Sequence, residues 1–265
     1  MALRDDSTRW FRRYVHKPEA TGRLVCFTPA GSMPSFYLDW ARTAPPSVEV
    51  LVVTLPGREE RSAEPPVTDL GSLADAVAQA LGGLGDRPTV LFGHSMGAAV
   101  AYEVSRRYEA SGGALAGLVV SACASPARQP DSRPGLTAYD DDQLATYLRT
   151  LGGTSNQVFD DPEVRQFVLD TFRADLAVLE PYRPDATRAR LRTPVQVFRG
   201  DQDPATPADD AARWAEVTDR FAGVRSFPGG HFYLLDQRSA VLHAAIEPLP
   251  GGVVPSASIH AQREG

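Results

Sequence analysis

The chain has few residues of several informative kinds. Of its 265 residues, two are cysteine, five are histidine and one, Lys17, is lysine. Two cysteines, Cys26 and Cys123, are too few for a disulfide scaffold and favour reduced side chains in a cytoplasmic protein. No run of about 18 apolar residues is present, so no membrane-spanning helix is expected. The first residues lack the apolar core of a secretion signal, and none is expected.

Charge and size narrow the class of protein further. The formal net charge is −6, which argues against a nucleic-acid partner. Hydrophobic residues make up 43% of the chain, an ordinary share for a globular enzyme. A length of 265 residues suits one domain large enough to bury a sizeable core.

Short apolar runs alternate with helical patterns along most of the chain. This alternation predicts an α/β fold with a mostly parallel sheet and helices on both faces. The expected strands are residues 24–27, 48–54, 89–92, 115–121, 195–199 and 224–227. The expected helices are residues 70–81, 98–109, 208–217 and 239–246.

The alternation stops between residues 121 and 194. Apolar spacing there predicts two helices, residues 140–151 and 162–179, with Asp140 and Asp161 as N-caps. We interpret residues 125–192 as a helical lid insertion, with Gly152 and Gly153 as a flexible joint. A packed helical hairpin without a substrate role is the alternative. The domain prediction is a single unit over residues 1–247, followed by a disordered tail over 248–265.

Residues 93–97 read Gly-His-Ser-Met-Gly between an apolar run and a helical run. A serine on such a strand–turn–helix is typical of the nucleophile elbow of serine hydrolases, where a strained turn exposes Oγ. Gly93 and Gly97 fit this turn because a Cβ at either position would collide with a neighbouring strand or helix. We predict that Ser95 is a catalytic nucleophile. The alternative is an ordinary glycine-rich turn.

The acid and the histidine of such hydrolases follow the serine in the chain. His231 comes after a predicted strand and a Pro-Gly-Gly turn, which would present its ring at the end of the sheet. The other histidines are less suitable: His16 lies too early, His94 lies inside the elbow, and His243 and His260 lie in a late helix and the tail. His231 is therefore the predicted general base.

The acid is expected after the strand at residues 195–199. Asp201 and Asp203 both follow that strand in the sequence Gly-Asp-Gln-Asp-Pro. We favour Asp203, at the tip of the turn, and keep Asp201 as the alternative. The acid would fix the imidazole tautomer and stabilise the imidazolium.

Two backbone N–H groups should form an oxyanion hole. One belongs to Met96, directly after the serine, and the other to the loop after an early strand. Residues 27–32 form that loop, and Ala30 is the best candidate donor. The alternative for Ala30 is an ordinary turn at the end of a strand.

Several further stretches complete a recognisable pattern. The chain resembles the stand-alone, editing (type II) thioesterases of polyketide and nonribosomal-peptide biosynthesis, a branch of the α/β-hydrolase superfamily. The resemblance runs from about residue 23 to 242. It rests on residues 27–31 (Phe-Thr-Pro-Ala-Gly), 55–58 (Leu-Pro-Gly-Arg), 93–97, 173–175 (Arg-Ala-Asp), 200–204 and 229–232 (Gly-Gly-His-Phe).

The resemblance implies Ser95 as nucleophile, Asp203 as acid, His231 as base, and Ala30 and Met96 as oxyanion donors. In this chain the early loop reads Ala-Gly-Ser where the family usually has Ala-Gly-Gly. The extra side chain, that of residue 32, leaves the exact shape of the loop open.

The resemblance also implies the substrate, which is an acyl group on the phosphopantetheine arm of a carrier protein. The implied role is the hydrolytic removal of stalled or incorrect acyl chains by a monomer that needs no cofactor and no metal. One alternative is a carboxylesterase acting on free oxygen esters. Another is a non-catalytic hydrolase-like binding protein, against which the intact Ser, Asp and His argue.

Docking of a carrier protein should need a local basic patch. Such carriers are generally acidic, and this chain is acidic as well, so overall attraction cannot bring them together. Arg58 and Arg61 follow the second strand at the edge where α/β ligand sites lie, and they are the favoured patch. The other candidates are Arg9, Arg12 and Arg13 near the start, and Arg188, Arg190 and Arg192 after the insert.

Overall fold

The computed structural model describes residues 9–129, 135–154, 156–185 and 189–251. Within these ranges seven strands form one sheet in the order β1-β3-β2-β4-β5-β6-β7. All neighbouring strands are parallel except β1, which runs antiparallel to β3. The strands are β1 (Phe11–Arg12), β2 (Gly22–Phe27), β3 (Val48–Val53), β4 (Thr89–His94), β5 (Gly117–Ser121), β6 (Val195–Gly200) and β7 (Phe221–Phe227).

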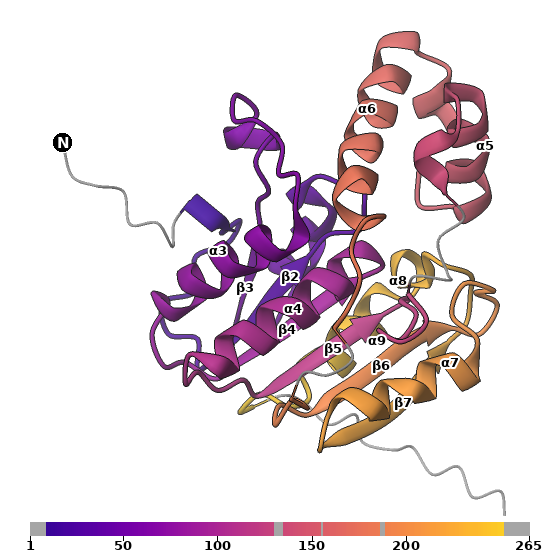
Figure 1. Ribbon diagram of the computed structural model, residues 1–265. Coiled ribbons are helices and arrows are strands. Elements are labelled where there is room, and N and C mark those ends of the chain that lie inside the picture. The colour runs from indigo at the N-terminus through magenta and orange to yellow at the C-terminus, as the bar shows by residue number, and fades with distance from the viewer. Residues whose placement is uncertain (1–8, 130–134, 155, 186–188, 252–265) are drawn as a thin grey trace, which may run out of the picture.

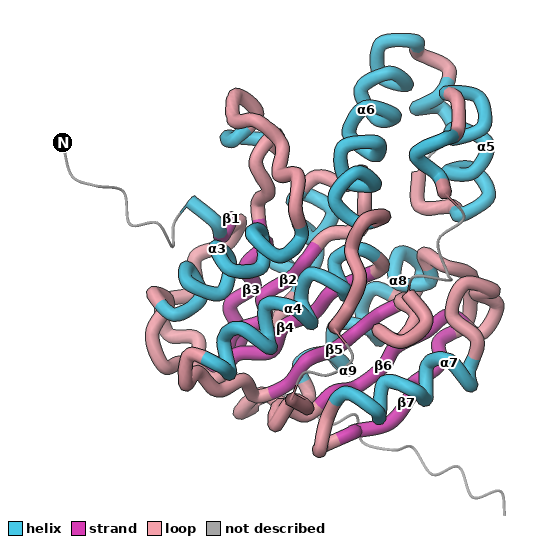
Figure 2. Tube along the Cα trace, in the orientation of Figure 1, coloured by secondary structure: helices cyan, strands magenta, loops and turns pink. Residues whose placement is uncertain are grey.

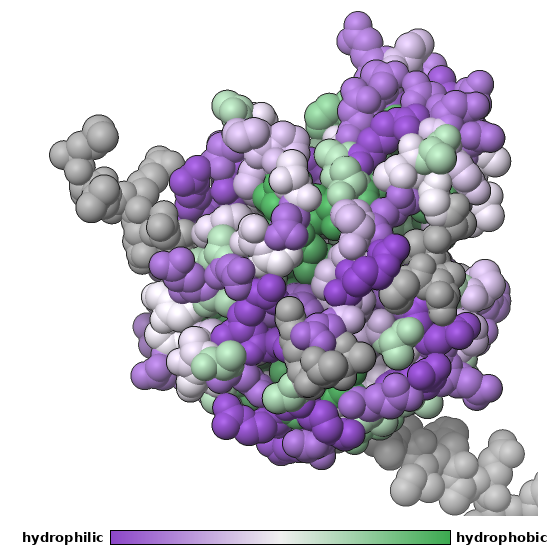
Figure 3. All heavy atoms as spheres, viewed as in Figure 1, coloured by the Kyte–Doolittle hydropathy of each residue, from purple (hydrophilic) through white to green (hydrophobic). Residues whose placement is uncertain are grey.

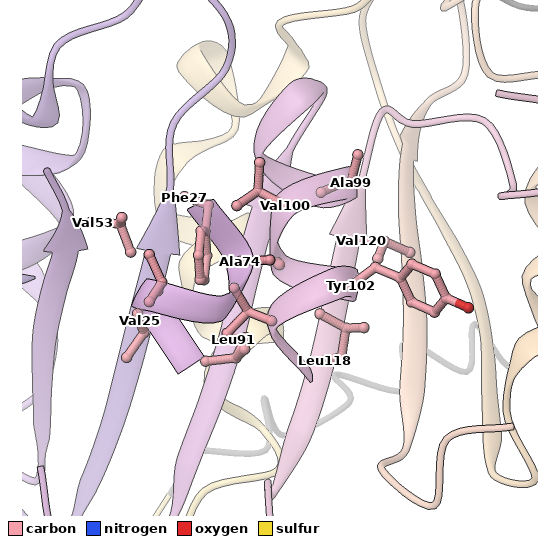
Figure 4. Packing of buried hydrophobic residues seen from close by; sticks show 14 of the residues in the cluster. Val25, Phe27, Val53, Ala74, Leu91, Ala99, Val100, Tyr102, Leu118 and Val120 are labelled. Carbon is pink, nitrogen blue, oxygen red and sulfur yellow. The ribbon is translucent and has the colours of Figure 1, made fainter. Parts of the chain in front are cut away.

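Helices cover both faces of this sheet (Figure 1). On one face α3 (Leu70–Gly82), α4 (Met96–Ala110) and α7 (Ala208–Ala212) pack in one apolar cluster, part of which Figure 4 shows. On the other face lie α2 (Leu38–Thr43) and α9 (Arg238–Ile246).

The alternation of side chains along β2 explains this layering. Val25 and Phe27 belong to the first cluster, whereas Leu24 and Cys26 belong to the second. Successive residues of a strand point to opposite faces, so a strand that is buried on both faces must be apolar throughout. The predicted α/β-hydrolase fold class is confirmed, and the predicted strands each match an observed one to within a few residues.

The helical insert lies beyond the carboxyl ends of the strands (Figures 1 and 2). It contains α5 (Asp141–Leu151) and α6 (Pro162–Leu179). Asp140 accepts the Gln143 N–H at 2.8 Å while the Gln143 side chain accepts the Asp140 N–H, and Asp161 accepts the Glu163 N–H at 2.9 Å. Both predicted caps are therefore confirmed. The insert has its own apolar cluster, which includes Leu136, Leu144, Leu148, Leu169, Phe172 and Leu176.

Several short elements are additional to the prediction. They are β1, α2 and α8 (Tyr233–Asp236), and the helix expected over residues 208–217 divides into α7 and the 3-10 helix Arg213–Val217. Leu249 is only 4% exposed, so the packed chain extends beyond the expected boundary at residue 247. The rest of the predicted tail, residues 252–265, lies outside the described residues. No helix in the described ranges combines the length and the apolar character needed to cross a bilayer.

Candidate active site

Ser95 lies on a strained turn between β4 and α4. Its φ and ψ are 54° and −119°, a conformation that costs about 1–3 kcal/mol for a residue with a side chain. A Cβ on Gly93 would lie 2.2 Å from the Gly97 carbonyl oxygen, and one on Gly97 would lie 2.2 Å from the Phe27 carbonyl oxygen. The predicted reason for both glycines is thereby confirmed. The turn directs the Ser95 side chain into a cavity.

His231 and Asp203 form a buried pair. The Nδ1 of His231 lies 2.9 Å from Asp203 Oδ2, and the two residues are 8% and 2% exposed. A carboxylate can only accept, so the Nδ1–H donates. In the neutral form of such a ring the lone pair is on Nε2, where a proton can be taken up.

Asp203 is held by further donors. The Ala205 N–H donates to its Oδ1 at 3.0 Å, and the Thr206 hydroxyl donates to its Oδ2 at 3.2 Å. Burial alone would raise the pKa of Asp203, but the hydrogen bond and charge of His231, with these two donors, hold that pKa below its ordinary value. Asp203 is therefore an ionised partner for the imidazole at neutral pH.

Asp201, the alternative acid, bonds to the backbone of the loop that precedes His231. Its Oδ1 accepts the Gly229 N–H at 3.0 Å, and its side chain is exposed. The two aspartates thus have separate partners: Asp201 holds the loop that carries His231, whereas Asp203 bonds to the His231 ring.

A buried chain of polar side chains lies beside His231. His94 Nδ1 is 2.8 Å from Ser121 Oγ, which is 2.6 Å from the Tyr233 hydroxyl. The rings of His94 and His231 lie 5.3 Å apart between centroids. Burial, and secondarily the charge of His231, hold the pKa of His94 well below its ordinary value, so His94 is neutral. No sequence pattern indicated Ser121 or Tyr233.

The two predicted oxyanion donors both line the cavity that contains Ser95 and His231. Met96 is the first residue of α4, where backbone N–H groups have no partner within the helix and the dipole favours negative charge. Ala30 lies in the loop after β2. The next residue, Gly31, has φ +77°, and Ser32 closes a turn by donating its N–H to the Pro29 carbonyl at 3.2 Å. Ser32 is thus accommodated without displacing Ala30 from the cavity.

The cavity has a volume of about 110 Å³ and lies between the sheet and the insert. Small residues form the side nearer the sheet, and larger apolar residues of the insert form the other side. In the space-filling view, apolar residues gather beside the base of α6 (Figure 3). The lining includes Ala30, Ala99, Ala122, Ala124 and Ala205, and from the insert Leu136, Tyr147, Leu151, Phe172 and Leu176.

The expectation that Arg58 and Arg61 form a docking patch is wrong, because both are buried. Arg58 is 4% exposed and pairs with Asp175 at 2.7 Å. Arg61 is 5% exposed, donates to the Thr54 carbonyl at 2.8 Å and pairs with Glu64. The partner of Arg58 is distant in the chain, whereas the hydrogen-bond partners of Arg61 lie within seven residues of it. These arginines stabilise the loop after β3 and are not available to a partner.

Among the described residues no three His, Cys, Asp or Glu side chains are grouped as a metal site would require. The site consists instead of a serine on a strand–helix turn, a histidine–aspartate pair and a helix N-terminus. On a mostly parallel sheet, this combination defines a serine hydrolase of the α/β-hydrolase class.

The comparisons with known proteins narrow this class. Residues 22–247 match the model of the thioesterase domain, so the chain belongs to the thioesterase family. This match confirms the predicted resemblance and the predicted enzyme class, a thioester hydrolase.

Individual relatives agree with the family. The chain is 39% identical over 238 residues to a probable cadicidin biosynthesis thioesterase of Streptomyces griseus, covering 89% of this chain and 65% of that protein. It is 36% identical over 239 residues to thioesterase PikA5 of Streptomyces venezuelae, covering 89% and 83%. The structure of the type II thioesterase BorB of the borrelidin biosynthetic cluster superposes with a TM-score of 0.82 at 39% identity, covering 94% and 100%.

Proposed function

We propose that this protein hydrolyses acyl thioesters carried on the phosphopantetheine arm of carrier proteins, and that it removes stalled or incorrect chains during polyketide or nonribosomal-peptide synthesis. The support for the substrate is the similarity to thioesterases of such clusters. The observation that carries the chemistry is the His231–Asp203 pair, whose histidine lines the same cavity as Ser95.

The proposed reaction has two steps. The His231 Nε2 takes the proton from Ser95 Oγ as Oγ attacks the thioester carbonyl carbon. The N–H groups of Ala30 and Met96 stabilise the oxyanion, the carbon–sulfur bond breaks, and the thiol leaves with the proton from His231. Water, activated by the same imidazole, then attacks the acyl–serine and releases the acid. These steps call on no cofactor and no metal.

The insert would act as a lid over this cavity, within a single domain. It contributes one side of the cavity, which supports such a role. A monomer in the cytoplasm is part of the same proposal. Cys26 and Cys123 are both free thiols, as expected in a reducing compartment.

One experiment tests the proposal against its alternatives. Turnover of an acyl–carrier protein is compared with turnover of the matching free oxygen ester. We expect kcat/KM for the acyl–carrier protein to be at least about tenfold higher, because the leaving thiol and the carrier both favour it. Equal or reversed values would favour a carboxylesterase, and the absence of turnover of either substrate would favour a binding protein.

A further inference from the structure

Three stretches that carry the family resemblance, yet contain no member of the proposed triad, meet at one point of the structure. They are the loop with Gly31, the loop with Arg58, and the Arg-Ala-Asp stretch that ends at Asp175 on α6. Asp175 is 144 residues from Gly31 and 117 from Arg58 in the chain. Three segments that are far apart in the chain are therefore in contact here.

Asp175 uses one carboxylate oxygen for each of the other two residues. Its Oδ2 accepts the Gly31 N–H at 2.7 Å, and its Oδ1 accepts from Arg58 Nη2 at 2.7 Å. Arg58 also donates to the carbonyl of Thr171, one turn earlier on α6, at 3.3 Å. Asp175 and Arg58 are 5% and 4% exposed, so water screens neither contact.

Helix α6 also contacts Gly31 through an apolar side chain. A Cβ on Gly31 would lie 3.2 Å from Cδ2 of Phe172, and Phe172 lines the cavity that contains Ser95. With φ at +77°, Gly31 adopts a conformation that favours glycine and brings its backbone close to the helix. The loop after β2 is thus fixed against α6 by one hydrogen bond and one close packing contact.

This hydrogen bond restrains the neighbouring oxyanion donor. The peptide between Ala30 and Gly31 is planar, so its N–H and its C=O point in opposite directions. Binding the Gly31 N–H to Asp175 directs the Ala30 carbonyl away from Asp175 and limits the backbone angles open to Ala30. The Ala30 N–H, on the other side of that residue, is limited with it.

We infer that Asp175 is a positioning residue that holds the Ala30 N–H in the oxyanion hole. The oxyanion hole then forms only when α6 is packed against the loop after β2. This inference rests on the proposed function, because it presumes that Ala30 is an oxyanion donor. The geometry of the carboxylate supports it, because one oxygen faces Arg58 and the other faces the Gly31 N–H. Burial raises the pKa of Asp175, and Arg58 and the Gly31 N–H offset that effect only in part.

Two double variants isolate the contact with Gly31. Arg58→Met with Asp175→Asn keeps an acceptor for the Gly31 N–H, whereas Arg58→Met with Asp175→Leu removes it. Both lack the buried charges, so neither leaves an unpaired ion that would unfold the protein. Removing a whole oxyanion donor costs about 10²- to 10³-fold in kcat. We expect the Leu variant to have a kcat for a small acyl thioester about 10- to 100-fold below the Asn variant, with KM within about twofold.

Affinity for a boronic acid provides a readout that a merely structural role would not change. Such an acid forms a tetrahedral adduct with Ser95 that places an oxygen in the oxyanion hole. We expect its affinity to fall by about the same factor as kcat. Equal kcat and equal affinity in the two double variants would overturn the inference.

The matched control is Asp141→Leu. It removes the carboxylate of another aspartate–arginine pair of the insert, at 2.7 Å to Arg173, which joins α5 to α6 and includes neither Gly31 nor Arg58. We expect near-normal kcat. A loss as large as that of the Leu double variant would assign the effect to general loosening of the insert, and would also overturn the inference.

If a double variant does not fold, hydrogen exchange of the unmodified protein decides. We expect the Gly31 amide to exchange slowly without ligand, and exchange as fast as that of an open loop would overturn the inference. The Ser95→Ala variant separates this inference from the proposed function. If Ser95→Ala loses turnover while the two double variants have equal kcat and equal affinity for the boronic acid, only the role of Asp175 is rejected. Full turnover in Ser95→Ala rejects the proposed function itself.

Discussion

The carboxyl end of the sheet and the helical insert are held in place in different ways. At the carboxyl end of the sheet, Ser95 directly follows β4. There the last residue of β6 contacts the loop after β7 so closely that a Cβ on Gly200 would lie 2.2 Å from the Gly230 carbonyl oxygen. Backbone pairing therefore sets the positions of the proposed catalytic groups. The insert instead packs around its own apolar cluster.

The end of α6 joins the insert to the rest of the protein. Val178 packs in the cluster of α3 and α4, Asp175 binds Arg58 and Gly31, and the Tyr182 hydroxyl donates to Glu103 at 2.7 Å. The outer part of the insert packs around its own small cluster, and regions with a small separate core open at a lower free energy than the central sheet. We propose on this basis that the loops at the carboxyl end of the sheet provide the chemistry and that the insert governs access to the site and its final alignment.

The largest expected effect tests the carboxyl end of the sheet. Ser95→Ala should lower kcat by about 10⁴-fold or more, because the hydroxyl is the proposed covalent nucleophile. The near-ultraviolet circular dichroism spectrum should stay unchanged, since alanine fits the turn about as well as serine. Steady-state kinetics with a small acyl thioester measure the loss. A loss below tenfold would place the nucleophile elsewhere.

The next effect distinguishes the two aspartates of one turn. Asp203→Asn should lower kcat by about 10⁴-fold through loss of the imidazole tautomer and orientation. Asp201→Asn is the matched control and should cost far less, because the Asp201 carboxylate accepts the Gly229 N–H whereas Asp203 bonds to the His231 ring. The reverse ranking in the same assay would move the acid to Asp201, and two small losses would reject both.

A smaller effect tests the contact between the insert and Phe232, the residue after His231. Gly152 and Gly153 have φ of +76° and +82°, so alanine at either position is strained by about 1–3 kcal/mol. Only at Gly153 would the new Cβ also meet Phe232, 2.5 Å from its Cγ and next to His231. Gly153→Ala should therefore lower kcat/KM about tenfold more than Gly152→Ala.

The same pair of variants tests the proposed hinge. If the joint lets the insert move, both substitutions should change KM and kcat for long acyl chains more than for acetyl. Equal effects across a series of acyl lengths would favour a static helical hairpin, and equal effects of the two variants would deny the role of the Phe232 contact.

The smallest expected effect concerns the docking of the carrier. With Arg58 and Arg61 buried, Arg9 and Arg12 are the better candidates, because antiparallel pairing of Phe11 with Val53 brings the start of β1 to the carboxyl end of β3. The side chain of Arg12 is 42% exposed. Arg12→Glu should raise KM for an acyl–carrier protein by about two- to fivefold and weaken its salt dependence. A small acyl thioester is the control, and an equal rise for it would exclude a docking role.

The sequence was most informative where neighbouring residues in the chain determine the structure. The serine turn needs glycines at fixed offsets, and the caps Asp140 and Asp161 lie next to the helices that they start, so local patterns predicted all of them. The choice of His231 and Asp203 followed from the chain order of serine, acid and histidine in such hydrolases, with the acid and the base on loops after late strands. Short strand β1 has two residues, too few to show any period.

Contacts between distant segments could not be predicted in this way. Arg58 was expected in a docking patch because its loop follows the carboxyl end of a strand, and its partner Asp175 lies 117 residues away. The hydrogen bonds of Ser121 to His94 and Tyr233 likewise depend on the tertiary packing of three segments. Only the family resemblance marked the stretches around Arg58 and Asp175, and it did not indicate that they touch.

The most direct test of the central claim is to trap the acyl–enzyme. The protein is mixed with a slowly hydrolysed acyl thioester, quenched in acid within milliseconds, digested and analysed by mass spectrometry. The account predicts the acyl mass on the peptide that contains Ser95 and none in the Ser95→Ala variant. An acyl group on any other residue, or an unmodified protein during full turnover, would contradict it.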